Sequence, residues 1–149
     1  YVARRMIIFA SEDVGNANPN AVQVAVACMQ SFDFVGAAEG WIPLAQCASY
    51  LAASPKSNSS YQGYQLALED VKKHGPLEVP LHLRNAPTKL MKNLNYGKDY
   101  KYAHNYEGNI VDQQHLPDKI KDQQYYHPSE NGHEKKLKEW LDRKSDLSQ

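Results

Sequence analysis

Residues 21–35 are the stretch that most restricts how this chain can fold. They read AVQVAVACMQSFDFV, with apolar side chains on nearly every side of a helical repeat. A helix of this kind is surrounded by other protein rather than lying on a surface. Asn18 and Pro19 favour a helix start, because Asn accepts a hydrogen bond from an unpaired N–H and Pro has no N–H to leave unpaired. We therefore predict a largely enclosed helix from about residue 19 to residue 35.

The first half of the chain predicts three more helices, separated by turn residues. Their expected ranges are 2–10, 41–53 and 57–73. Pro55 ends the second of these, since proline disfavours helical backbone in the residue before it. Small side chains in that segment, such as Ala45 and Ala48, are expected to let two helices approach closely. From Tyr61 to Val71, apolar residues recur at spacings of three and four, which is typical of an amphipathic helix.

The composition changes after Gly75. Pro, Gly, Asn, Asp and Tyr become more frequent, and the helical periodicity fades. Here we expect only short pieces and one last helix: an extended piece at 77–83, a helix at 86–94 with Leu90, Met91 and Leu94 inward, a turn at 117–121 and a helix at 132–144. Asn131 followed by Glu134 resembles a capping box, in which each side chain bonds to the other residue's backbone N–H.

The predicted fold class is therefore mainly α. We expect a helical bundle over residues 1–75, followed by an irregular, proline-rich extension over residues 76–149 that packs on it and ends in a helix. Cys28 and Cys47 lie in apolar stretches and are expected to be buried free thiols in a reducing compartment. The chain opens with Tyr1 rather than Met, so we expect it to be a fragment of a larger protein.

Charge and hydropathy limit the classes of function. The 17 basic and 17 acidic side chains give a net charge of zero, which argues against a strongly basic nucleic-acid module but allows a local basic patch. No apolar run is long enough to cross a bilayer, and no signal peptide opens the chain. We therefore expect a cytoplasmic protein without a membrane partner.

Motifs for catalysis are missing from the sequence. The pair Gly97-Lys98 lacks both the earlier glycine and the following Ser or Thr of a phosphate-binding loop. No Gly-x-Ser-x-Gly is present, no two histidines have the close spacing of metal ligands, and there is no Cys-x-x-Cys. We therefore predict no catalytic residue, no cofactor site and no metal site in this chain. A hydrolase built from scattered His, Asp and Glu residues is the enzymatic alternative.

Residues 84–106 interleave cations with tyrosines. Stacking faces beside positive charges are what proteins use to bind single-stranded nucleic acid. The structural alternative is that the tyrosine rings cover a helical core while their hydroxyls and the lysines stay in water. The candidate nucleic-acid contacts are Arg84, Lys89, Lys92, Lys98, Lys101, Tyr100 and Tyr102.

Several motifs that span nearly the whole chain resemble a known family. They are ASEDVGNANP at 10–19, IPLAQ at 42–46, ASPKSN at 53–58, VPLHLRNAPTKLMK at 79–92, YGK at 96–98 and YKYAH at 100–104. Their order resembles the C-terminal region of the MgsA/RarA family of AAA+ ATPases, whose eukaryotic relatives are the Werner-helicase-interacting proteins. Asn18 stands where many members have Asp, and the segment 107–124 matches only loosely.

The resemblance implies a helical collar related to that of clamp loaders, followed by a family-specific extension. It also implies self-association, typically as a homotetramer, in a nucleoid-associated protein that acts at stalled or damaged replication forks and has affinity for DNA and for single-stranded-DNA-binding protein. ATP and magnesium are expected only in an ATPase domain outside these residues. The apolar helix 19–35 points to self-association separately, because a chain of this size is expected to leave part of it uncovered. The alternative function is a single-stranded nucleic-acid-binding module that uses residues 84–106.

Overall fold

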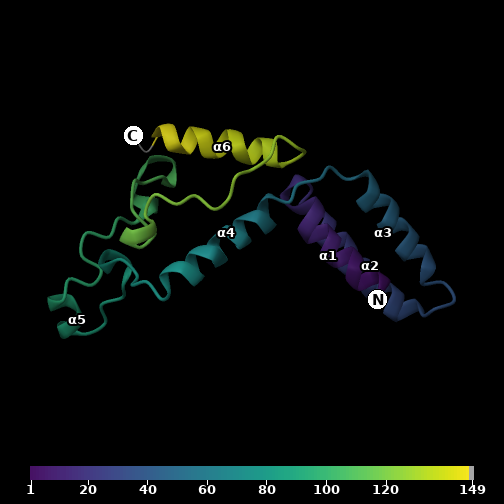
Figure 1. Ribbon diagram of the computed structural model, residues 1–149, viewed down its shortest axis with the longest axis horizontal. Coiled ribbons are helices and arrows are strands. Elements are labelled where there is room, and N and C mark those ends of the chain that lie inside the picture. The colour runs from purple at the N-terminus through teal and green to yellow at the C-terminus, as the bar shows by residue number, and fades with distance from the viewer. Residues whose placement is uncertain (148–149) are drawn as a thin grey trace. The chain divides into compact units, whose positions relative to one another are not determined.

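The computed structural model describes residues 1–147, and helices make up its regular structure (Figure 1). Within these residues there are six α-helices: α1 (Val2–Phe9), α2 (Ala21–Val35), α3 (Trp41–Ala53), α4 (Ser59–His74), α5 (Lys89–Asn93) and α6 (Glu134–Leu147). Short 3-10 or π-helical turns lie between them, and no β-strand occurs in residues 1–147. The predicted fold class, mainly α with an irregular extension and a last helix, is confirmed.

The chain divides into two compact units. Among the described residues, unit 1 consists of residues 1–67 and 125–140, and unit 2 consists of residues 68–124 and 141–147. The division falls inside α4 and α6. A division into compact units does not test a domain boundary, so the predicted boundary near Gly75 stays a prediction.

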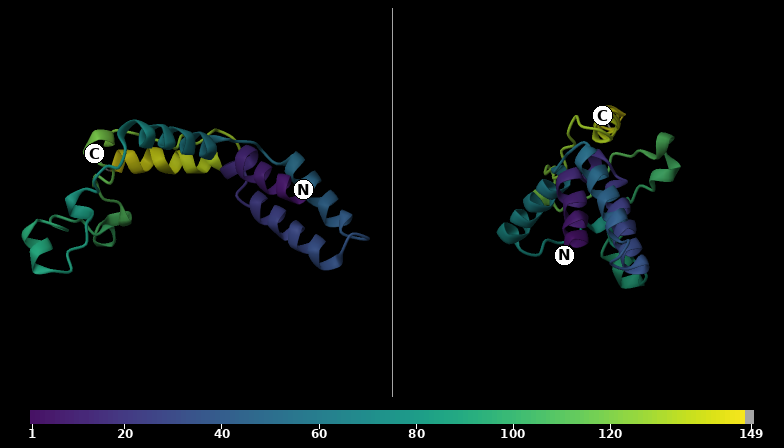
Figure 2. Two further views of the ribbon diagram at one scale, coloured as in Figure 1. Left: turned by 60° about the horizontal axis from the view of Figure 1, so that its bottom comes forward. Right: turned by 90° about the vertical axis from the view of Figure 1, so that its right-hand side faces the viewer.

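The hydrophobic core of unit 1 lies where α1, α2 and α3 meet (Figure 2). Small side chains on α2, Ala21, Ala25 and Cys28, are buried and allow the other helices to come close. From α3, the buried residues are Leu44, Cys47 and Leu51, at spacings of three and four. The prediction that Ala45 and Ala48 make the close contact is wrong: both are exposed, because the larger residues of α3 occupy the inward face.

Cys28 and Cys47 are buried and free, as predicted. Burial, together with the neighbouring Cys28, raises the pKa of the Cys47 thiol to about 11. Cys47 therefore serves as a small apolar side chain in the core at neutral pH.

The end of α3 is fixed by polar side chains from two directions. Lys56 donates its ammonium protons to the carbonyl oxygens of Leu51 (2.6 Å) and Ser54 (2.5 Å), which places a cation at the negative end of the helix. Asn18 donates to the Tyr50 hydroxyl (2.9 Å) and to Ser54 Oγ (3.0 Å). The Asn18 segment thus both precedes α2, as predicted, and ties it to α3.

Unit 2 contains a shorter helix and more exposed apolar side chains than the sequence predicts. The expected helix 86–94 shrinks to α5, Lys89–Asn93, where the Thr88 hydroxyl accepts from the Met91 N–H (3.3 Å). The prediction that Leu90 and Leu94 point inward is wrong, since their exposed fractions are 68% and 52%. The expected extended piece at 77–83 instead ends in a 3-10 turn, Leu81–Leu83, whereas the turn predicted at 117–121 is present as Asp118–Ile120.

Candidate interaction surfaces

The connection between α2 and α3 leaves large apolar side chains in water. Phe34 is 91% exposed, Ile42 71%, Trp41 60% and Val35 44%. We call these four residues the apolar tip of unit 1. One copy of the chain thus leaves an end of α2 uncovered, as the sequence predicts. Clustered apolar side chains that are this exposed are typical of an interaction surface.

A pocket of about 390 Å³ adjoins the apolar tip. Its walls come from the start of α1, the end of α2 and the start of α3, and the lining residues are Tyr1, Val2, Ala3, Arg4, Met29, Phe32, Asp33, Trp41 and Leu44. Phe32 and Trp41 meet edge to face, with ring centroids 6.0 Å apart. Glycine at position 40 permits this packing, because an added Cβ would lie 2.5 Å from the Phe32 ring. The surface therefore offers both protruding and concave apolar parts.

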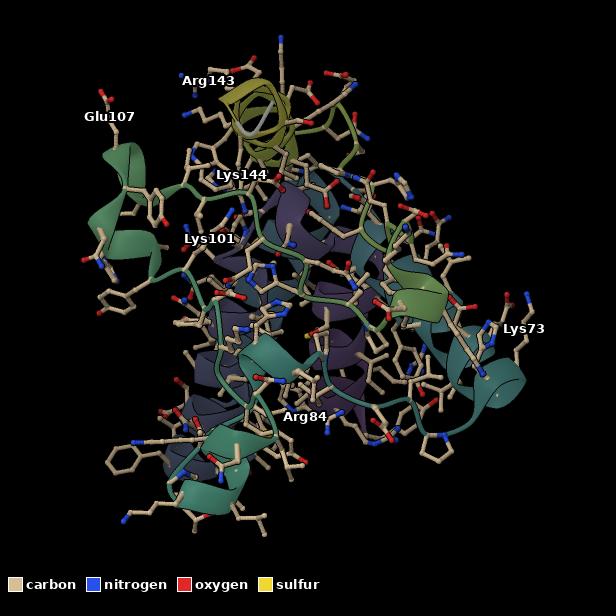
Figure 3. The ribbon with its side chains drawn as sticks, turned by 90° about the vertical axis from the view of Figure 1, so that its left-hand side faces the viewer. Lys73, Arg84, Lys101, Glu107, Arg143 and Lys144 are labelled. Atoms are coloured by element: carbon tan, nitrogen blue, oxygen red, sulfur yellow. The ribbon has the colours of Figure 1, made fainter. Side chains whose placement is uncertain are left out.

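Of the predicted nucleic-acid contacts, Arg84 is the most firmly held by its own chain. Its guanidinium donates to the Glu78 carboxylate (2.8 Å), to the Val79 carbonyl (2.6 Å) and to the Tyr96 hydroxyl (3.2 Å). The hydrogen bonds that Arg84 donates to Glu78 and Tyr96 raise the pKa of its guanidinium. Figure 3 labels Arg84 and Lys101, which lie at separate places along the irregular chain of unit 2. Arg84 therefore has a structural role, and its contact with nucleic acid stays a prediction.

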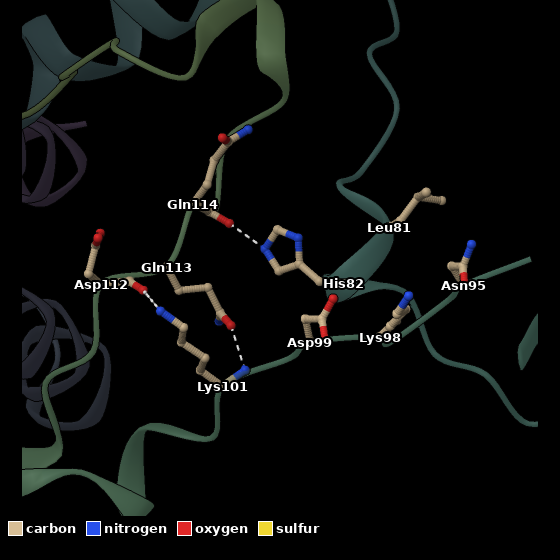
Figure 4. A pocket seen from close by; sticks show the side chains of 9 residues that line it. All are labelled: Leu81, His82, Asn95, Lys98, Asp99, Lys101, Asp112, Gln113 and Gln114. Atoms are coloured by element: carbon tan, nitrogen blue, oxygen red, sulfur yellow. Dashed lines mark hydrogen bonds between the residues drawn. The ribbon is translucent and has the colours of Figure 1, made fainter.

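Lys98 and Lys101 line one open pocket of about 420 Å³ in unit 2 (Figure 4). Its other lining residues are Leu81, His82, Asn95, Asp99, Asp112, Gln113 and Gln114. Lys101 donates its ammonium proton to the Asp112 carbonyl (2.9 Å) and its backbone N–H to Gln113 Oε1 (2.7 Å). The structure therefore brings two of the predicted cations together, in a pocket that also contains two carboxylates.

The other four candidates are exposed side chains of unit 2. Lys89 and Lys92 lie on α5, and Tyr100 and Tyr102 are 52% and 53% exposed. The Tyr102 ring lies 5.0 Å from the His104 ring, centroid to centroid, at a tilt of 53°. Neither tyrosine belongs to the hydrophobic core cluster, and about half of each residue is covered, so both explanations of the segment stay open. Their binding to nucleic acid stays a prediction.

The pocket that contains Lys98 and Lys101 also contains His82, so it bears on the hydrolase alternative. His82 Nε2 lies 2.7 Å from the Gln114 carbonyl oxygen, to which it donates. The lining residues include no Ser, Thr or Cys that His82 could activate as a nucleophile. The pocket does hold His82, Asp99 and Asp112, residue types that the hydrolase alternative names, so that alternative stays a prediction. Residues 1–147 hold no group of three His, Cys, Asp or Glu side chains placed to share a metal ion.

Sequence reasoning missed the role of Glu134. Its side chain is 0% exposed, and its carboxylate accepts from Ser57 Oγ (2.6 Å), the Tyr126 hydroxyl (2.8 Å) and the Ser129 N–H (2.8 Å). The predicted capping box with Asn131 is wrong, because the carboxylate faces inward and the Asn131 amide donates to the Lys56 carbonyl (2.9 Å).

The hydrogen bonds decide the ionisation state of Glu134. Burial alone raises the pKa of this carboxyl, but the bonds from Ser129, Ser57 and Tyr126 outweigh burial and lower the pKa below its usual value. Burial and the adjacent carboxylate raise the pKa of Tyr126, so its hydroxyl keeps the proton that it donates. The carboxylate therefore stabilises the fold at neutral pH, and this contribution is lost as the pH falls through the lowered pKa.

The all-helical unit and its motif order can be compared with known proteins. The family model described as MgsA AAA+ ATPase C terminal matches residues 1–145, so the chain belongs to this family of AAA+ ATPase C-terminal domains. The family resemblance seen in the sequence is confirmed. Among the described residues, no helix is both long and apolar enough to cross a membrane.

Individual relatives agree with the family model. Replication-associated recombination protein A of Coxiella burnetii is 47% identical over 143 residues, which cover 95% of this chain and 32% of that protein. The protein of the same name from Escherichia coli K12 is 48% identical with the same coverage. ATPase WRNIP1 of Dictyostelium discoideum is 44% identical over 127 residues, 85% of this chain and 14% of that protein. The chain spans about a third of the length of the first two relatives.

Proposed function

We propose that this chain is the self-association and interaction domain of a replication-associated, DNA-dependent AAA+ ATPase, and that it assembles as a homotetramer. The observation that carries the proposal is the apolar tip, where Phe34 and Ile42 are 91% and 71% exposed. Burying such side chains against a second copy removes apolar area from water, which is the main driving force for association. Membership of the MgsA family and the names of the relatives support the replication role.

The proposal assigns no catalytic step to these residues. ATP and magnesium belong, in this scheme, to an ATPase domain elsewhere in the parent protein. DNA and single-stranded-DNA-binding protein are the partners that we propose for the whole protein, which works at stalled or damaged forks in the cytoplasm, associated with the nucleoid. This domain holds the subunits together so that several ATPase domains act on one DNA.

Light scattering after size exclusion tests self-association. At tens of micromolar, we expect the chain to have the mass of four copies. Replacing Phe34 and Ile42 together by serine should raise the dissociation constant at least about tenfold, since exposed aromatic and aliphatic anchors contribute most of the binding energy of an interface. The matched control is Leu90→Ser, at a position that is 68% exposed but lies in unit 2. A monomeric parent chain, or equal masses for the tip variant and the control, would contradict the proposal.

A second candidate function rests on the exposed tyrosines of unit 2. We propose that Tyr100 and Tyr102 stack with bases of a single strand while Lys98 and Lys101 neutralise its phosphates. The exposed ring of Tyr102 next to His104, and the pocket that brings Lys98 and Lys101 together, support this candidate. Base stacking on aromatic rings tolerates any sequence, so little sequence preference is expected.

Fluorescence anisotropy with a labelled oligothymidine checks the second candidate. At low salt, Tyr102→Ala should weaken binding by about 1–3 kcal/mol. Lys98→Ala should also weaken it and should reduce the salt-dependence slope by about 0.7. Lys119→Ala, an exposed lysine outside the segment, is the control. If the parent chain does not bind at low salt, this function is excluded for the isolated domain.

A further inference from the structure

Residues 125–134 return to unit 1 after the chain has passed through unit 2. We call this segment the strap. We propose that the strap can detach from residues 1–67, and that the hydrogen bonds to the buried Glu134 carboxylate hold it in place. We call this carboxylate and its hydrogen-bond donors the clasp.

The strap lies so close to residues 1–67 of the same unit that glycine is needed at two of the contacts. An added Cβ at Gly63 of α4 would lie 2.8 Å from the Tyr125 carbonyl oxygen. Gly132 has φ +54°, and a Cβ there would overlap the Ala17 carbonyl oxygen and the Pro55 ring. The next N–H, that of His133, donates to the same Ala17 oxygen (2.8 Å). The backbone of the strap is therefore in close contact with residues 1–67.

The clasp joins two parts of the chain that are far apart in sequence. Tyr126 and Ser129 bind the Glu134 carboxylate from within the strap, and Ser57 binds it from the α3–α4 connection, 77 residues away. Asn16 donates to the Tyr126 hydroxyl (3.1 Å) and to Ser60 Oγ (3.2 Å), which extends the network to the loop before α2. In the part of the chain that the structure describes, no buried side-chain nitrogen or oxygen lacks a hydrogen-bond partner, as a buried polar cluster requires.

Neutral donors alone hold the charge of Glu134. Within residues 1–147, no Lys, Arg or His forms an ion pair with this carboxylate. A buried charge without a counter-ion depends on all of its hydrogen bonds, because each lost donor leaves it less solvated than it would be in water. The clasp is therefore either fully formed or released. When it is released, the strap detaches, while the core of α1, α2 and α3 keeps its own apolar contacts.

Glu134→Gln tests the clasp with almost no change in volume. The substitution removes the charge, and the amide NH2 replaces one acceptor oxygen, so either the Ser129 N–H loses its acceptor or a hydroxyl that donated must turn and accept. Hydrogen exchange followed by mass spectrometry should show amides of the strap, such as those of Ser129 and His133, exchanging about 10- to 100-fold faster. This factor expresses the worth of a hydrogen bond to a charged group as an equilibrium ratio. Amides in the middle of α2 and α3 should keep their parent rates.

Two further variants keep the test decisive. Glu130→Gln makes the same substitution at an exposed strap position that pairs with Lys138, and it should change exchange little. Ser57→Ala removes the donor from the other side and should open the strap to a similar extent, with less than additive effect when combined with Glu134→Gln. The proposal is overturned if Glu134→Gln exchanges like Glu130→Gln in the strap, or if α2 and α3 accelerate as much as the strap does.

Discussion

Replacing Gly15 by alanine should lower the free energy of unfolding by about 2–6 kcal/mol. Gly15 has φ +52° and ψ −141°, a conformation that strains any residue with a side chain by about 1–3 kcal/mol. The new Cβ would also lie 2.6 Å from the Ser57 carbonyl oxygen, and relieving such an overlap costs about 1–3 kcal/mol more. Urea denaturation followed by circular dichroism measures the change.

Gly36→Ala is the matched control for this variant. Gly36 also has a positive φ with extended ψ, +81° and 178°, but nothing lies within 4 Å of its added Cβ. It should show the backbone strain alone, about 1–3 kcal/mol. If both variants unfold at the same urea concentration, the close approach of Gly15 to Ser57 has no energetic weight and our account of that loop is wrong.

Leu51→Ala should destabilise the chain by about 2–5 kcal/mol, the usual range for removing a buried leucine side chain. Leu51 is 3% exposed and belongs to the cluster where α1, α2 and α3 meet. Its neighbours on α2 are small, so they cannot expand to fill the cavity. Thermal or urea denaturation at one fixed chain concentration measures the loss, because self-association would make stability depend on concentration.

Leu90→Ala provides the comparison for Leu51→Ala. The same atoms are removed from a side chain that is 68% exposed, so the change should stay within about 0.5 kcal/mol. A large effect at Leu90, or a small one at Leu51, would mean that the core is not where the structure places it.

Local signals in the sequence were sufficient for the long helices. Residues 41–53 carry both a helical apolar pattern and a proline that ends it, and α3 spans these positions. The apolar segment 21–35 indicated correctly that one copy would leave part of the helix uncovered. The pocket beside the apolar tip could not be predicted, because Tyr1 and Val2 reach it only through the tertiary packing of α1.

The errors share one physical cause, which is that long-range contacts override local patterns. Asn131 and Glu134 have the spacing of a capping box, but Ser57, 77 residues earlier, offers the carboxylate a better partner in the interior. Leu90 and Leu94 have helical spacing, but α5 is short and ends before Leu94, and both side chains are exposed. The intrachain role of Arg84, whose guanidinium is held by Glu78 and Tyr96, was also not visible in local patterns, while its contact with nucleic acid stays a prediction.

The close contact between Gly63 and Tyr125 means that residues 68–124 interrupt unit 1 without separating its two halves. From Gly63 to Ala67, where the interruption begins, the helix rises only about 6 Å. A short linker from Ala67 to Tyr125 would therefore let a chain without residues 68–124 close on itself with both glycine contacts in place. Residues 68–124 are therefore an insertion in unit 1, and unit 1 does not need them to connect its two parts.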